Sequence, residues 1–593
     1  SAASDVYKRQ PNTEVIELEK NYLNKLKEIN TSKIAYSVAE ELRGRETTDK
    51  FQLKSVVVSY VLYRAALDEN VCIDSLEEFF QNSVMPEDLK NIVNKNLANI
   101  WGVITSLKNK YSADELLSYI LFNNDLEDTK SSDCSTPDGI IKLADTILDV
   151  QKNDSVLELC SGKGNFFTET FLYQEKFNYF GVELNYTANE IAQIRAALMD
   201  ENISLILNDA LEYRNGKKFD KLFANYPFMV KNPSMDEYKG NICKAFDIPI
   251  DVIQRASSDW IFNATIIDQM KESGKAVAIM TNGATWNSSD KKIRKFFIEN
   301  GYVEAVISLP AKLFNGFAIP TTLIVFSKNN KKIKMVDARE ICVRERRNNV
   351  LTDDCVSKII ELLQNDGEKS ITKTIEEFAN NEYVLNATRY LEVVPKIENG
   401  LELGAVTKQI TRGAQIKAAE LDEIKANEAT PYKYLTLANI NDGIISTDDE
   451  QYLREIPENL KKFCVKNNSI ILTKTGMPEV KTAVVQIEEN TELLATGNLF
   501  IIEVDETKIN PFYVQAFFAS ETGVSLFRSI STGSVLPTIS LSKLKSLVIP
   551  APPMEEQIVI ANKYAAAMDE IILLKRKLEK GIAKMKHLYD EEV

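Results

Sequence analysis

The chain has 593 residues, of which 44% are hydrophobic, and this indicates three or four globular domains with sizeable cores. A single histidine, His587, excludes a His triad and a His metal cluster, and seven cysteines without a Cys-x-x-Cys pair argue against disulfides and structural zinc. No apolar run approaches the roughly 18 residues that span a bilayer, and there is no secretory leader. We therefore expect a cytoplasmic protein with no membrane partner and no metal.

The net charge is −15, which by itself does not favour binding to nucleic acid. Global charge describes solubility more than binding sites, so a nucleic-acid surface would have to be locally basic. The stretches 328–347 and 575–586 are the candidates, although a solvated surface is the commoner explanation of such stretches.

Residues 1–125 are predicted to form a helical N-terminal domain. Apolar residues recur at spacings near 3.6 in 34–42, 51–67 and 89–107, with few Gly or Pro. After a polar loop, Thr136 as N-cap and Pro137 in the first turn predict a helix over 138–149.

Residues 126–345 alternate short apolar runs with helical patterns, which predicts a parallel sheet in a Rossmann-like α/β domain. Strands are expected at 155–159, 179–182, 204–207, 219–224, 275–280, 303–309 and 321–326, with helices at 259–271 and 291–299. In open α/β sheets ligands lie outside the carboxyl ends of the strands. The ends of the first four strands carry Gly162 and Gly164, Glu183, Asp209 and Asn225.

The first strand runs into Cys160-Ser161-Gly162-Lys163-Gly164-Asn165-Phe166, where two glycines let the backbone pass close to a ligand. Glu183 follows the second strand, about 20 residues on, where a carboxylate can accept both ribose hydroxyls of a nucleoside cofactor. Phe167 replaces the third glycine of a dinucleotide fingerprint, and there is no Gly-Lys-Ser/Thr. A nucleoside without pyrophosphate, such as S-adenosylmethionine, fits better, with Glu158 and Glu183 as the acidic pair.

The fourth strand ends at Asn225-Tyr226-Pro227-Phe228. An amide oxygen and a backbone carbonyl can each accept a hydrogen bond from an exocyclic amine. Pro227 fixes φ and stiffens the turn, and Phe228 offers a flat face on which a base can stack. Taken alone, the segment is equally well explained as a strand that ends in a proline turn.

The tetrapeptide resembles the Asn/Asp-Pro-Pro-Tyr/Phe signature of amino-group methyltransferases, above all DNA adenine-N6 methylases, and departs from it at Tyr226. The resemblance implies that the four strand ends line the cofactor loop, the ribose, the adenine amine and the target base. It implies S-adenosylmethionine as cofactor, with no metal. The catalytic residues would be Asn225, Tyr226, Pro227 and Phe228, and the cofactor-binding residues Thr136, Pro137, Glu158, Gly162, Gly164, Asn165, Phe166, Glu183 and Asp209.

Further segments resemble type I modification subunits. They are Glu41-Leu42-Arg43-Gly44, Phe314 with Ile319-Pro320-Thr321, Glu376-Glu377-Phe378, Tyr383-Val384-Leu385-Asn386 and Arg389-Tyr390-Leu391. We predict that 346–398 is a helical connector.

Residues 399–553 change to β-branched and aromatic runs broken by turns, with strands expected at 432–437, 469–473, 483–487 and 499–504. The turn-rich segments 438–443, 472–476 and 533–539, with 549–553 and Glu556-Gln557, resemble one target-recognition domain of a type I specificity subunit, which carries two. We predict an α+β recognition domain; the alternative is an unrelated α+β binding domain.

Residues 554–593 are predicted to form one long helix with a coiled-coil-like apolar stripe. The stripe consists of Tyr564, Met568, Ile571, Leu574, Leu578, Ile582 and Met585. It is expected to pair with a second copy of the chain, which makes a homodimer, or to pack on helices of 354–380 in a monomer.

The resemblance implies a site-specific DNA methyltransferase of restriction-modification type, which methylates adenine N6 in double-stranded DNA. A separate restriction subunit is a further partner that the resemblance allows. Three alternatives remain open. They are a methylase of glutamine in proteins, a cytosine-N4 methylase, which usually has Ser at position 225, and a non-catalytic DNA-binding or assembly protein.

Overall fold

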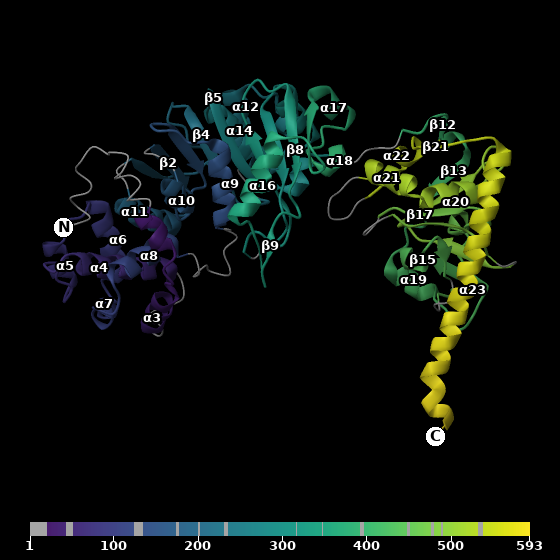
Figure 1. The fold of residues 1–593 in the computed structure, drawn as a ribbon, viewed down its shortest axis with the longest axis horizontal. Coiled ribbons are helices and arrows are strands. Elements are labelled where there is room, and N and C mark those ends of the chain that lie inside the picture. The colour runs from purple at the N-terminus through teal and green to yellow at the C-terminus, as the bar shows by residue number, and fades with distance from the viewer. Residues whose placement is uncertain are drawn as a thin grey trace. The chain divides into compact units, whose positions relative to one another are not determined.

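The computed structural model has two compact units, residues 1–391 and 392–593 (Figure 1). It describes residues 21–42, 51–123, 135–173, 177–199, 202–230, 235–315, 317–346, 348–391, 396–446, 451–475, 480–487, 490–531 and 538–592. No helix in these ranges is long and apolar enough to cross a membrane.

The first unit begins with a helical bundle. Its described helices are α3 (Ser32–Leu42), α4 (Phe51–Leu67), α5 (Leu76–Asn82), α6 (Glu87–Leu97), α7 (Gly102–Leu107) and α8 (Ala113–Phe122). Helix α4 lies at the centre, because nearly every residue from Gln52 to Tyr63 is buried. The prediction of one helix over 89–107 is wrong, since the chain turns between α6 and α7. Helix α8, which we did not predict, begins with a capping box between Ser112 and Glu115.

A nine-stranded sheet forms the body of the first unit, in the order β11-β8-β6-β7-β5-β4-β1-β2-β3. Its strands are β1 (Ser155–Leu159), β2 (Asn178–Glu183), β3 (Ile203–Leu207), β4 (Phe219–Ala224), β5 (Met270–Thr281), β6 (Val303–Ser308), β7 (Thr321–Phe326), β8 (Lys332–Asp337) and β11 (Ser370–Thr374). Strands β1 to β5 pair in parallel, and β7 is inserted antiparallel between β5 and β6. Every strand predicted for this domain is present, and the predicted Rossmann-like α/β fold is confirmed, although the sheet is mixed because β7 and β11 run antiparallel to their neighbours.

Two apolar cores hold helices against this sheet. One contains residues of α12 (Met235–Phe246), α13 (Ile250–Ile253), α14 (Ser258–Gln269), α15 (Lys291–Glu299), α17 (Ile375–Asn380) and α18 (Thr388–Leu391). The other contains residues of α9 (Asp138–Leu148), α10 (Asn165–Tyr173), α11 (Tyr186–Met199) and α16 (Asp353–Gln364). Two short strands, β9 (Val343–Arg344) and β10 (Asn349–Val350), form a hairpin.

Residues 346–391 are not a separate helical connector. Strand β11 pairs antiparallel with β8 at the edge of the main sheet, and Phe378 of α17 is fully buried in the core beside it. The helical pattern of α16 and α17 hid the strand between them, whose Ser-Ile-Thr-Lys-Thr sequence carries a single large apolar residue. The remaining domain boundaries stay predictions.

The second unit is an α+β domain. A four-stranded antiparallel sheet, in the order β13-β20-β17-β18, consists of β13 (Thr407–Arg412), β20 (Leu499–Val504), β17 (Ile470–Thr473) and β18 (Thr482–Val484). Three two-stranded pairs join β12 (Gly400–Glu402) to β21 (Val548–Pro550), β14 (Tyr432–Leu435) to β19 (Glu492–Ala495) and β15 (Ile440–Asn441) to β16 (Ile444–Ile445). The helices are α19 (Ala418–Ile424), α20 (Pro511–Ala519), α21 (Glu521–Ile530), α22 (Leu541–Lys545) and α23 (Met554–Glu592).

All four strands predicted in this domain are present, with ends that shift by a few residues. The strand expected over 432–437 stops at Leu435 because Leu437–Asn439 form a 3-10 turn. The predicted turns at Gly476 and 533–537 lie outside the described residues.

The few buried residues described in the long helix α23 all lie in its first half. The helix packs on α20, with Ala561 and Met568 buried, and Tyr564 accepts a hydrogen bond from Gln515 at 3.3 Å. Further along, Leu578 and Met585 are 64% and 67% exposed. The second half of the predicted apolar stripe is therefore not covered by the described part of this unit.

Gly443 is the position that lets this helix approach the domain. Its φ is +75°, and a Cβ there would lie 2.5 Å from the Tyr564 hydroxyl. We expect Gly443→Ala to lower the free energy of unfolding of this unit by about 1–3 kcal/mol, because both the backbone and the contact become strained. Urea unfolding followed by circular dichroism measures the change.

Adding Tyr564→Phe to Gly443→Ala should restore part of the loss. Gly581→Ala is the matched control, because a Cβ at this position of α23 meets open space. It should leave the unit as stable or more stable. Equal destabilisation by the two alanines would contradict the role of Gly443.

Candidate active site at the ends of β1 to β4

The loop between β1 and α10 has an unusual backbone. Cys160, Gly162 and Gly164 have φ values of 62°, 55° and 84°. A Cβ on Gly162 would meet nothing within 4 Å, whereas one on Gly164 would lie 2.2 Å from the Phe167 ring. Gly162 thus leaves open space for a ligand, and Gly164 is required by packing.

Glu183, at the end of β2, holds this loop. Its Oε2 accepts a hydrogen bond from the Gly162 N–H at 2.7 Å, and its Oε1 accepts one from the Asn185 N–H at 2.6 Å. Both carboxylate oxygens are thus held at the cavity wall, where the predicted contact with ribose hydroxyls would form.

Glu158 differs from Glu183 in its environment. It is 3% exposed, and the buried Tyr179 hydroxyl donates a hydrogen bond to it. Burial, with a smaller contribution from the nearby charge of Glu183, raises the pKa of Glu158 well above its usual range. The predicted acidic pair therefore consists of one carboxylate that binds backbone amides and one carboxyl group that favours its protonated form.

Asp209 follows β3. Its Oδ2 accepts a hydrogen bond from the Tyr238 hydroxyl of α12, and its Oδ1 accepts one from the Leu211 N–H, both at 2.8 Å. These two contacts hold the carboxylate at the rim of the same sheet edge.

Asn225, at the end of β4, is oriented by Thr136. The Asn225 Nδ2 donates to the Thr136 Oγ1 at 2.9 Å, which determines the direction of the amide group. The prediction that Thr136 caps a helix is wrong: α9 begins after Pro137, and its N-cap makes no side-chain hydrogen bond.

The side chain of Tyr226 points into the core. It is 1% exposed, stacks on Phe262 with ring centroids 4.7 Å apart, and donates from its hydroxyl to Asn263 Oδ1 at 3.1 Å. The turn after β4 is therefore anchored to α14, and the tyrosine side chain does not obstruct the Asn225 amide.

Phe228 belongs to an aromatic cluster. Its ring stacks on Phe317 at 4.8 Å and meets Phe314 edge-on at 5.6 Å. Both partners lie in the loop between β6 and β7, so this loop supports the residue that we expect to stack on a base. The sequence motif singled out Phe314 but not Phe317.

These groups surround one cavity of about 570 Å³, a size typical of sites for small molecules. Every candidate residue named from the sequence lines it except Pro137 and Gly164. Sequence reasoning missed several lining residues, including Gln52 and Leu53 of α4, Lys163, Asn185 and Phe262. Only Asn185 had a usable signal, because an Asn two residues after Glu183 is a typical N-cap for α11.

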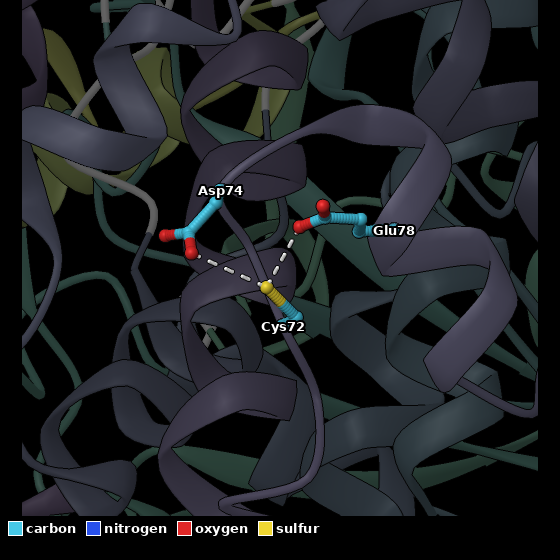
Figure 2. Close-up of side chains that lie close together, drawn as sticks. All are labelled: Cys72, Asp74 and Glu78. Carbon is cyan, nitrogen blue, oxygen red and sulfur yellow. Dashed lines mark hydrogen bonds between the residues drawn. The ribbon is translucent and has the colours of Figure 1, made fainter.

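A second cluster of polar groups lies in the bundle, away from this cavity. Cys72, Asp74 and Glu78 form a group whose ligand atoms lie within 4.8 Å of one another (Figure 2). The Cys72 thiol donates hydrogen bonds to both carboxylates. The bond to Glu78 raises the pKa of the Cys72 thiol. Lys108 also neutralises Asp74 at 2.9 Å. A thiol held in its protonated form is a poor metal ligand.

Comparison with protein families divides the chain in the same way as the two units. Residues 115–399 match the N-6 DNA Methylase family, and residues 413–583 match the type I restriction modification DNA specificity domain. The chain therefore joins an N-6 DNA methylase domain to a type I specificity domain. The resemblance to both kinds of type I subunit is confirmed.

Curated relatives carry the two halves separately. The type I restriction enzyme MjaVII methylase subunit of Methanocaldococcus jannaschii is 27% identical over 46% of this chain and 51% of its own. The HindI methylase subunit of Haemophilus influenzae is 25% identical over 51% of this chain and 74% of its own. The putative MjaX specificity subunit of M. jannaschii is 25% identical over 37% of this chain and 54% of its own. The chain spans about half the length of the first of these relatives.

Two solved structures share the fold. The type I methyltransferase subunit from Streptococcus thermophilus has a TM-score of 0.50 at 19% identity, and covers 60% of this chain and 98% of its own. The type IIG restriction endonuclease BpuSI has a TM-score of 0.53 at 12% identity, over 90% of this chain and 75% of its own.

The buried Glu158 predicts a pH dependence. A carboxyl group whose pKa is raised by folding contributes stability that is present below the pKa of the unfolded chain and is lost as pH rises through the folded pKa. The free energy of unfolding should therefore fall by up to about 1.4 kcal/mol per pH unit in that window. Glu158→Gln should remove this contribution and gain stability relative to the parent as pH rises above the pKa of the unfolded carboxyl group.

Thermal unfolding of the two proteins across this pH range measures the difference. Glu212→Gln, at an exposed glutamate, is the control and should keep the parent's pH profile. Parallel pH profiles for the parent and Glu158→Gln would show that Glu158 is ionised in the folded protein.

Proposed function

We propose that the chain is a site-specific DNA methyltransferase that transfers a methyl group from S-adenosylmethionine to adenine N6, in a restriction-modification context. The observation that carries the proposal is the Asn225 amide, which is oriented by Thr136 at the wall of the cavity. The N-6 DNA methylase match over 115–399 supports the choice of the target amine.

The chemistry of the cavity fits the cofactor. Glu158, Glu183 and Asp209 line it, and Lys163 is the one cation among its described lining residues. S-adenosylmethionine carries a sulfonium and an ammonium group, and the acidic side chains of Glu183 and Asp209 suit these cations. The open space at Gly162 lets the cofactor approach the backbone. When bound, the cofactor supplies an electrophilic methyl group.

The residues of the chain contribute position and hydrogen bonding. The Asn225 side-chain oxygen and the Tyr226 carbonyl accept hydrogen bonds from the adenine amine and stabilise the charge that develops on its nitrogen. The buried Tyr226 ring keeps that carbonyl in place, and Phe228 stacks on the base. An adenine must leave the duplex to reach this cavity, which costs a few kcal/mol.

The specificity domain is the natural source of the binding energy that offsets base flipping. We propose double-stranded DNA as its partner, a homodimer formed through α23, and a separate restriction subunit as a further partner. The exposed Leu578, Ile582 and Met585 support the dimer, because an apolar stripe of this kind is usually covered in a coiled coil.

The reaction is tested with DNA, labelled cofactor and digestion to nucleosides. We expect the label in N6-methyladenine. Asn225→Ala should lower the methyl-transfer rate by on the order of 100- to 1000-fold, because one preorganised acceptor is lost, with cofactor affinity nearly unchanged. Glu183→Ala should instead weaken cofactor binding, as measured by isothermal titration.

Asn241→Ala is the matched control, at an exposed position of α12, and should retain the parent's rate. Label found only in N4-methylcytosine or in protein would replace the proposed reaction by another. Equal loss of cofactor affinity in both site variants would show that their roles are misassigned.

A two-fold symmetric dimer would recognise a two-fold symmetric DNA sequence. We therefore expect the DNA target to consist of two inverted half-sites separated by a gap. Light scattering should give twice the chain mass, and Leu578→Glu with Ile582→Glu should reduce it to the monomer. Lys577→Glu, on the charged flank of the same helix, should remain dimeric. A monomeric parent that modifies a contiguous, non-palindromic sequence on one strand would refute the dimer.

A further inference from the structure

The helical bundle contributes a polar side chain to the cavity. Gln52, in the first turn of α4, lines the cavity and is 8% exposed. Its amide makes no hydrogen bond to a described residue, and its polar atoms keep access to the cavity. A carboxamide that faces a cavity and has no protein partner is free to form hydrogen bonds with a ligand there. A ligand in the cavity is the partner that the geometry offers.

Arg195 of α11 holds the bundle, and with it Gln52, in position relative to the loop between β1 and α10. This guanidinium is 0% exposed. It donates to the carbonyls of Ile120 and Asn123, at the end of α8, at 2.9 and 3.2 Å. It also donates to the Lys163 carbonyl at 3.1 Å and to Asn165 Oδ1 at 2.6 Å. One buried cation thus ties the bundle to the loop that begins α10.

Two ion pairs also join the bundle to the sheet domain. Lys27, at the start of the bundle, lies 2.6 Å from Glu169 of α10 and 2.8 Å from Asp138 of α9. Helix α4 itself packs on α11. The bundle and the sheet domain therefore form one framework around the cavity, and Gln52 is presented to it by a rigid helix.

We infer that Gln52 is a cofactor-contacting residue, and that the helical bundle is a wall of the cofactor site. The inference rests on the proposed function for the identity of the cofactor. A carboxamide both donates and accepts, so it can bind the carboxylate and ammonium of the methionine end or the ribose hydroxyls. Arg195 is a positioning residue, since it acts through the loop.

The test compares Gln52→Leu with the parent by isothermal titration, using S-adenosylhomocysteine and methylthioadenosine as probes. Leucine keeps the volume of the side chain and removes its polar atoms. We expect roughly 5- to 30-fold weaker binding of S-adenosylhomocysteine, the effect of one or two lost hydrogen bonds. Weaker binding of both probes assigns the contact to the nucleoside, and loss for S-adenosylhomocysteine alone assigns it to the methionine end.

Gln81→Leu is the matched control, at an exposed glutamine of α5, and should bind both probes like the parent. The melting temperature without ligand should be no lower in Gln52→Leu, while the shift produced by S-adenosylhomocysteine should shrink. Parent-like affinity of Gln52→Leu for both probes would overturn the inference and leave the proposed function intact. A parent chain that binds neither probe would overturn both.

Discussion

The parallel pairing of β1 with β4 is the constraint on which the site depends. Leu159 pairs with Ala224, so the two strand ends lie side by side. The chain runs outward from β1 through β2 to β3, and then returns to β4 on the other side of β1. This reversal leaves a crevice between the loops that follow β1 and β4, because those loops turn away from each other. The glycine loop and Asn225 meet there although they are about 60 residues apart in sequence.

Two residues of the site, Tyr226 and Phe228, are held in place by packing against neighbouring aromatic rings. The turn after β4 has Tyr226 in place of the first Pro of the Asn/Asp-Pro-Pro-Tyr/Phe signature, so it lacks the fixed φ of that proline. Burial of the ring on Phe262 and the hydrogen bond to Asn263 restore the constraint through tertiary contacts. Phe228 is supported in the same way by Phe314 and Phe317. The backbone of this chain is thus held by packing where another sequence could hold it by proline.

Burial also separates the roles of two glutamates that look alike in the sequence. Glu183 accepts hydrogen bonds from two backbone N–H groups at the end of β2. Glu158 has been removed from water and receives a hydrogen bond from Tyr179, while the charge of Glu183 opposes its ionisation. The two glutamates therefore differ in environment: Glu183 binds backbone amides, whereas burial favours the protonated form of Glu158.

The sequence alone determined the strands β1 to β4, the polar residues at their ends and the order of the two domains. Apolar runs of five or six residues, followed by Gly, Glu, Asp or Asn, are local signals that need no knowledge of distant contacts. Only the tertiary structure decided that β11 completes the main sheet, that Thr136 binds Asn225 instead of capping α9, that Gln52 of α4 lines the cavity, and that Arg195 ties the bundle to the loop before α10. Each of these depends on groups far apart in the chain, whose proximity is set by the packing of helices on the sheet and leaves no periodic mark in the sequence.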